Sequence, residues 1–262
     1  NHPEAEVAGL PFVYLDPRLD GDSYDQARRL WLEQIESHED DPAVIGNAAN
    51  FFFLGDIDLS EELLKKARRL EPDNPEWSRR LGRLYALRMT NEPSDLRKAY
   101  AARSLAHLEN SLVDTTDRLH RFYLLSDLAK TAFEAEQWEK ARACADELLE
   151  LAPQYHDNWN YGNAVHHGNL ILGRLALRSG DPSKAKGYLI QAAKTPGSPQ
   201  LKSFGPSMGL AKELLREGEK EAVIEYLKLC AQFWESGRGQ LTKWIDIIEA
   251  NGEPDFGSNV SY

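Results

Sequence analysis

Cysteine and methionine are scarce in this 262-residue chain, basic residues are outnumbered by acidic ones, and long apolar runs are absent. The two cysteines, Cys144 and Cys230, are too few for a disulfide framework or a four-cysteine zinc site, and we expect both to be core thiols. No apolar run approaches the ~20 residues that span a membrane, so no membrane insertion is expected. Only 31 Lys and Arg oppose 42 Asp and Glu, and the net charge of −11 argues against a nucleic-acid-coating protein.

Signatures of catalysis and of cofactor binding are also missing. The chain has no glycine-rich phosphate loop, no Gly-x-Ser-x-Gly turn and no His-Glu-x-x-His helix. We therefore expect a protein that is not an enzyme and that carries no cofactor.

Helical periodicity is what the sequence does contain, with 42% apolar residues available for a core. Two segments, 44–72 and 169–196, align on a Gly-Asp pair and place apolar residues three or four positions apart on each side of it. The glycine, Gly55 or Gly180, supplies the left-handed backbone that ends one helix, and the aspartate favours the start of the next. Each segment therefore predicts a helix, a tight turn and a second helix.

The residues of these segments resemble the tetratricopeptide repeat, a helix–turn–helix unit of about 34 residues. Five successive matches begin near residues 41, 75, 122, 166 and 204. The match rests on Ala48, Gly55, Ala67 and Pro72, then Leu81, Gly82 and Tyr85, then Leu128, Ala129, Ala141 and Pro153, then Leu172, Gly173, Ala176, Gly180 and Ala192, then Leu210, Ala211, Gly218 and Ala222. Asn47 and Ser60 depart from the pattern. The resemblance implies an all-α fold, a right-handed α-α superhelix (a solenoid) of about five helix pairs with capping helices.

We expect one solenoid domain over residues 1–262. Residues 1–40 would form an N-terminal strap and a capping helix from about Tyr24 to Glu36, with Ser23 as its N-cap. Residues 41–235 would hold the five repeats, and 236–262 a second capping helix with an extended tail. The stretches 161–169, 203–206 and 254–257 also resemble an uncharacterised bacterial group of tetratricopeptide-like proteins, which implies no activity. The start at Asn1 fits an exported protein trimmed of its signal and a cytoplasmic protein equally well.

In this superfamily, fixed positions of each first helix line a concave, ligand-binding groove. The resemblance implies that in repeats two to five these positions hold seven cations: Arg79, Arg83, Lys130, Arg174, Arg178, Lys212 and Arg216. Only Glu76 and Glu134 are acids among them, and repeat one offers apolar residues that include Phe52. Focused positive charge would attract an acidic segment. The alternative is that these long side chains only cover apolar helix surface and pair with neighbouring acids.

Two further segments interrupt the repeats. The insert 155–168 gathers hydrogen-bonding and aromatic side chains: Trp159, Asn163, His166 and His167. A Pro- and Gly-rich connection at 195–208 is expected to be rigid and non-helical. Together they would form a small-molecule or anion pocket, or the insert would only lengthen the first helix and pack on repeat three. A metal site from His156, Asp157 and His166 or His167 is disfavoured, because helical i,i+4 spacing is absent.

The leading hypothesis is a non-catalytic protein-interaction scaffold whose groove binds an acidic or extended peptide. The alternative is a helical-repeat protein that binds a small molecule or anion through the two interrupting segments. The oligomeric state is not specified by the sequence.

Overall fold

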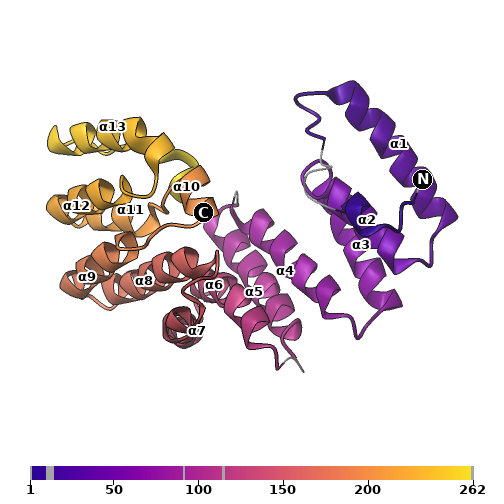
Figure 1. Cartoon of the computed structure of the whole chain (residues 1–262), viewed down its shortest axis with the longest axis horizontal. Helices are drawn as coiled ribbons and strands as arrows, with labels where there is room; N and C mark the ends of the chain where they lie inside the picture. Colours follow the sequence, from indigo (N-terminus) through magenta and orange to yellow (C-terminus); the bar gives the residue numbers. More distant parts are fainter. Residues whose placement is uncertain (1, 10–14, 91, 114–115, 261–262) are drawn as a thin grey trace. The chain divides into compact units, whose positions relative to one another are not determined.

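The computed structural model of the chain describes residues 2–9, 15–90, 92–113 and 116–260. Over these residues the protein is all-α, with short 3₁₀ turns and no strand, and successive helices pack against one another in pairs (Figure 1). This is the fold class predicted from the repeats. Among the described residues, no helix is both long and apolar enough to cross a membrane.

The helices fall into two compact units, residues 1–115 and 116–262. Unit 1 comprises η1 (Glu6–Gly9), α1 (Gly21–Ser37), α2 (Pro42–Phe52), α3 (Ile57–Leu70), α4 (Pro75–Thr90) and α5 (Ser94–Asn110). Unit 2 comprises α6 (Arg118–Glu134), α7 (Trp138–Leu151), η3 (Ala152–Tyr155), α8 (Tyr161–Arg178), α9 (Pro182–Ala193), α10 (Pro199–Phe204), α11 (Gly209–Arg216), α12 (Lys220–Cys230), η4 (Glu235–Gly237), α13 (Arg238–Glu249) and η5 (Gly257–Val260). The single continuous domain expected from the sequence stays a prediction.

Aspartates cap the helices that the Gly-Asp pairs predict. Asp56 accepts a hydrogen bond from the backbone N–H of Leu59 at the start of α3. Asp181 does the same for Lys184 at the start of α9, and Gly180 before it has a φ of +79°. A side-chain oxygen at the N-cap satisfies a first-turn N–H that has no partner within the helix. Local sequence therefore sets where one helix of a pair ends and the next begins.

The small residues of the repeat pattern have a packing role. A Cβ added at Gly82 in α4 would lie 2.7 Å from the Leu108 side chain of α5. A Cβ at Gly173 in α8 would likewise collide with Leu210 of α11. Because real Cβ atoms do not approach other carbon atoms so closely, only glycine allows these helices their observed separation.

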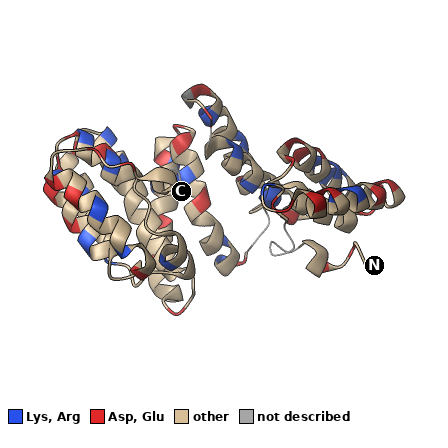
Figure 2. Cartoon of the chain, turned by 90° about the horizontal axis from the view of Figure 1, so that it is seen from above, with Lys and Arg blue, Asp and Glu red and all other residues tan. Residues whose placement is uncertain are grey.

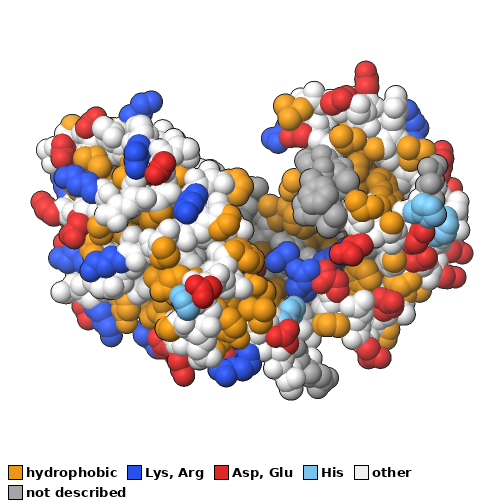
Figure 3. Space-filling model, in the orientation of Figure 1, with side chains coloured by type: hydrophobic (Ala, Val, Ile, Leu, Met, Phe, Trp, Pro, Cys, Tyr) orange, Lys and Arg blue, Asp and Glu red, His pale blue; other side chains and the backbone are white. Residues whose placement is uncertain are grey.

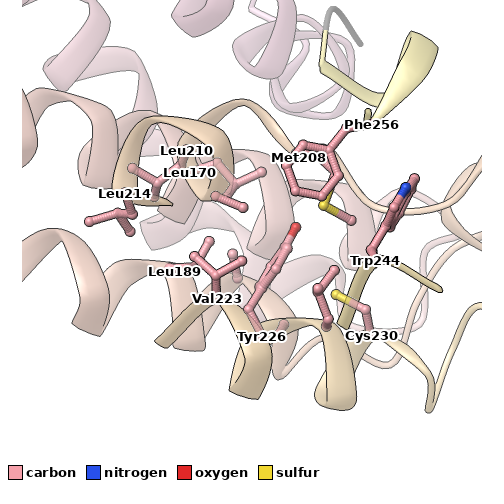
Figure 4. Close-up of a cluster of buried hydrophobic side chains, with 14 of the residues drawn as sticks. Leu170, Leu189, Met208, Leu210, Leu214, Val223, Tyr226, Cys230, Trp244 and Phe256 are labelled. Atoms are coloured by element: carbon pink, nitrogen blue, oxygen red, sulfur yellow. The ribbon is translucent and has the colours of Figure 1, made fainter. Parts of the chain in front are cut away.

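Each unit has its own apolar core. In unit 1 the core joins α1 to α4, and the ring of Tyr24 stacks on Phe51 with centroids 5.3 Å apart. In unit 2 the core joins α8, α9, α11, α12 and α13 and also takes in the tail after α13 (Figure 4). Phe256 of that tail is 1% exposed and meets the Trp244 ring edge to face at 5.0 Å. The predicted extended tail is therefore anchored by a buried aromatic side chain.

Both departures from the repeat pattern have structural partners. The Asn47 amide donates to the carbonyl oxygens of Pro3 (2.8 Å) and Ala5 (3.0 Å), which fastens the N-terminal segment to α2. The Ser60 hydroxyl is buried and donates to the Ala49 carbonyl at 2.7 Å, which links α3 to α2. Polar side chains at these two positions thus pair with backbone acceptors, partly buried ones for Asn47 and a buried one for Ser60.

Four local expectations need correction. The first capping helix begins at Gly21, and its N-cap is Asp20, whose carboxylate accepts from the Ser23 N–H. The connection at 195–208 is not wholly non-helical, because α10 forms within it with Ser198 as N-cap. The first helix of repeat four starts at Tyr161, several residues earlier than the repeat spacing indicated. Cys230 is buried as expected, whereas Cys144 is only half-buried.

Candidate functional site

The first helices of the repeats in unit 2 present one surface on which most of the predicted groove residues lie. Helix α8 contacts both α6 and α11. Residues three or four positions apart share a helix face. We call this surface the first-helix face, and it carries Tyr123, Asp127, Lys130 and Glu134 of α6, His167, Arg174 and Arg178 of α8, and Lys212, Glu213 and Arg216 of α11.

Arg174 is held at the middle of the first-helix face by two acids. Its guanidinium bonds Glu134 of α6 and Glu213 of α11, each with a nitrogen–oxygen distance of 2.8 Å. It also lies 4.0 Å from the centroid of the Phe133 ring. One cation between two carboxylates leaves a net charge of −1, so Arg174 cross-links three helices and adds no positive charge to the surface. The sequence pattern missed Glu213, which lies 39 residues from Arg174.

Lys130 and His167 lie on neighbouring helices of the same face. Burial lowers the pKa of Lys130, and the nearby Asp127 carboxylate opposes that shift. Burial, reinforced by the Lys130 charge, lowers the pKa of His167 well below its ordinary value, so its ring is neutral near pH 7. His167 therefore supplies no positive charge here, and burial disfavours the charged form of Lys130.

Arg178 and Arg216 are the last residues of α8 and α11, and Lys212 lies one turn before Arg216. Arg178 lies over the Trp138 ring at 3.9 Å from its centroid, in an open pocket of about 500 Å³ that α7 lines with Glu139, Arg142 and Asp146. Arg216 approaches Glu253 at 3.6 Å, and both side chains are mostly exposed. Over the described residues, Arg178 and Lys212 have no carboxylate within ion-pair distance.

Acidic and basic side chains alternate over unit 2. Figure 2 shows red and blue segments interleaved along its helices, and Figure 3 shows the same mixture on the visible side. The expected separation, with bases on the groove positions and acids elsewhere, is thus only partial. Asp127, Glu134 and Glu213 all lie on the face that was expected to hold mainly cations.

Trp159 forms an aromatic platform with Tyr123 at the N-terminal end of α6. The two rings stack with centroids 5.5 Å apart, and the Asn158 amide donates to the Tyr123 hydroxyl at 2.8 Å. Trp159 remains 51% exposed, so one face of this fixed indole is open to a partner. Tyr123 was not among the predicted site residues, although it occupies one of the groove positions of repeat three and was recognisable from that spacing.

The side chains of Asn163 and His166 form hydrogen bonds to the 195–208 connection. The Asn163 carbonyl oxygen accepts from the Ser198 hydroxyl at 2.6 Å. His166 is fully buried and lies 3.0 Å from the Ala192 carbonyl oxygen, while its Nε2 accepts from the Ser207 N–H at 3.1 Å. Because Nε2 is an acceptor, Nδ1 carries the proton and donates to Ala192. These contacts favour a structural role for the two segments over a ligand pocket.

The predicted site residues in unit 1 do not form one surface. Phe52 is fully buried in the core, so its side chain is closed to a ligand, and its expected role in an apolar groove end needs correction. Arg79 pairs with Glu76 at 2.5 Å within α4. Arg83, one turn later on the same helix, is exposed. Of the predicted site residues in unit 1, only Arg83 is thus exposed.

The described part of the chain has no cluster of three or more His, Cys, Asp or Glu residues placed to hold a metal ion. His156 lies 3.0 Å from Asp157 on the surface, whereas His166 is enclosed in the core. His156 and Asp157 are therefore exposed, whereas His166 is buried, so the three side chains of the disfavoured metal hypothesis do not share one site.

Comparison with known families identifies one segment of the chain. Residues 46–102 match the family model of the tetratricopeptide repeat, and this range covers most of α2, all of α3 and α4, and part of α5. No curated protein sequence matches the chain. Repeats of this family commonly serve as protein-interaction scaffolds and are generally non-catalytic. The match covers less than a quarter of the chain, and it supports a tetratricopeptide-repeat character that the helix pairs after it share.

Proposed function

We propose that this protein is a non-catalytic interaction scaffold whose first-helix face binds an extended peptide of acidic character. The observation that carries the proposal is the Trp159–Tyr123 platform, a fixed and half-exposed aromatic pair on the same helix face as Lys130. Tryptophan and tyrosine contribute more than most residues to binding energy at protein interfaces. Their rings are already stacked, so binding costs little side-chain entropy.

The acidic character of the partner rests on Arg178 and Lys212. Arg174 is already neutralised by Glu134 and Glu213, and each of its three guanidinium nitrogens faces one of these carboxylates. Arg178 is exposed, lies over an aromatic ring and has no ion pair among the described residues, so its N–H groups stay available for a carboxylate. Because the face also holds acids, its attraction for an anionic peptide is modest and salt-sensitive.

The test uses fluorescent twelve-residue peptides that combine Glu and Asp with one aromatic residue. The control peptides have the same sequences with Lys in place of each acid. We expect the acidic peptides to raise the fluorescence anisotropy saturably, more strongly at 50 mM than at 300 mM salt. Trp159→Ala should weaken binding by about tenfold, the scale of a single interface hot spot.

Charge-reversal variants distinguish binding at the first-helix face from nonspecific attraction by the net charge of the protein. The double variant Arg178→Glu, Lys212→Glu should abolish binding of the acidic peptides. The matched control is Lys228→Glu, Lys243→Glu, which changes the net charge equally on exposed positions of α12 and α13. Equal losses in both double variants, or no binding of any acidic peptide to the unmodified protein, would refute the proposed function.

A further inference from the structure

A column of stacked rings lies within unit 1. Tyr85 of α4 stacks on His107 of α5 at 5.5 Å and 16°, and on Tyr100 of α5 at 6.2 Å and 21°. Tyr85 is 3% exposed, whereas Tyr100 and His107 are half-buried. Tyr100 and His107 are seven residues apart and therefore lie on one face of α5.

Two arginines flank this column. Arg103 lies 5.7 Å from the centroids of both Tyr85 and Tyr100. The guanidinium atom Nη1 of Arg68, on α3, lies 3.2 Å from Nδ1 of His107. Arginine is always protonated, so Arg68 donates to a neutral imidazole. Burial, reinforced by the Arg68 and Lys65 charges, lowers the pKa of His107 to about 4, which agrees with that neutral ring.

Neither arginine is neutralised by an acid. The neighbouring carboxylates, Asp58 and Glu61, are both held by Arg88, and Glu61 also bonds Lys65 at 2.5 Å. Within the described ranges, neither Arg68 nor Arg103 has a carboxylate partner. The two acids are thus matched by two other cations, and the cluster keeps a net charge of +2.

The contacts of both arginines leave hydrogen-bond donors unused. Arg103 lies beside the two tyrosine rings and, over the described residues, its guanidinium makes no hydrogen bond, so its five N–H donors are unused. Arg68 uses one donor on His107. Two such forks with an excess charge of +2 match a dianion with three terminal oxygens better than they match a single carboxylate.

We propose that Arg68 and Arg103, set around the Tyr100–Tyr85–His107 column, bind a phosphate monoester group. The proposal needs only this face of unit 1 and is independent of peptide binding at the first-helix face of unit 2. The phosphate belongs either to free phosphate or to an aromatic phosphomonoester whose ring adds to the column.

His107 offers a direct readout of binding. Its ring faces Tyr85, Arg68 and Lys65, with Glu61 nearby, so a dianion bound beside it would favour the protonated imidazole and raise its pKa. The experiment follows the His107 ring signals by NMR in the full chain as pH is varied, with no addition, with inorganic phosphate, and with phenyl phosphate. We expect saturable shifts and a His107 pKa that rises by about one unit.

Variants identify the groups responsible. Arg68→Gln with Arg103→Gln should abolish the effect, and Arg68→Lys with Arg103→Lys should weaken it at least threefold, because lysine keeps the charge and loses the fork. The control, Arg29→Gln with Arg69→Gln, removes two exposed arginines of the same unit and should leave binding unchanged. Tighter binding of phenyl phosphate identifies an aromatic monoester as the ligand, and equal binding identifies phosphate alone. An unmoved His107 in the unmodified protein, or equal loss in the control, overturns the proposal.

Discussion

Acid should destabilise unit 2 through His166, the buried histidine that joins α8 to the 195–208 connection. Its Nδ1–H donates to Ala192 and its Nε2 accepts from Ser207, so both ring nitrogens are used by the neutral form. A protonated ring would lose the Ser207 bond and place a charge in a fully buried position. Burial accordingly lowers the pKa of His166 to about 4, although the Ala192 hydrogen bond raises it.

The pH window follows from the two pKa values. In the unfolded chain His166 takes up a proton as pH falls through about 6.5, whereas in the folded protein it does so only near 4. Between these values the unfolded state holds one more proton, so the free energy of unfolding falls as the pH falls. The loss contributed by His166 is about 2 kcal/mol at pH 5, relative to pH 8.

The assay is urea unfolding of the full chain at pH 8 and pH 5, for the natural protein and for His166→Gln. Four of the six tryptophans lie in unit 2, so tryptophan fluorescence reports mainly on that unit. Glutamine offers a donor and an acceptor but does not titrate, so the variant should lose about 2 kcal/mol less between the two pH values. His107 lies in the other unit and titrates alike in both proteins, whereas the difference between them includes the coupling of His166 to the neighbouring His167 ring. An identical loss in the two proteins would refute the reasoning.

Two further predictions concern the ion pairs and the close helix contacts. Arg174→Met should lower the free energy of unfolding in urea by about 1–2 kcal/mol, because it leaves two half-buried glutamates without their cation. Arg216→Met, at an exposed ion pair, should change it by less than about 0.5 kcal/mol, and equal effects of the two substitutions would contradict the cross-linking role of Arg174. Gly162→Ala places a Cβ against a backbone carbonyl oxygen of the connection and should lower the melting temperature by several degrees. Gly187→Ala in α9 meets open space and should gain about 0.5–1 kcal/mol, so a loss there would contradict the packing argument.

The boundaries of the helices were largely predictable, because they depend on residues close together in the chain. A capping aspartate acts on N–H groups two or three positions away, as Asp181 does on Lys184, and a glycine such as Gly180 adopts its left-handed conformation locally. Where the prediction was wrong, two local signals competed. Ser23 and Asp20 can both cap a helix, and in the structure Asp20 is the N-cap of α1.

The candidate site was predictable only as a set of positions. The spacing of the repeat placed Lys130, Arg174 and Lys212 on first helices, but it did not show that Glu213 would meet Arg174 from another helix. Nor did it distinguish Phe52, which is enclosed in the core, from a side chain that lines a groove. Residue type and spacing say which face a side chain occupies, whereas charge compensation depends on which residue comes to lie opposite.

The sequence by itself determined the all-α fold, the order of the helix pairs and the places where helices approach closely, since caps, periodicity and glycines act over a few residues. Only the tertiary structure decided which cations stay uncompensated, which ring nitrogen of His166 carries the proton, and that rings from α4 and α5 stack between two arginines. Those properties arise between residues tens of positions apart. They depend on distances of a few ångströms and on exclusion of water, and both are set only when the helices pack.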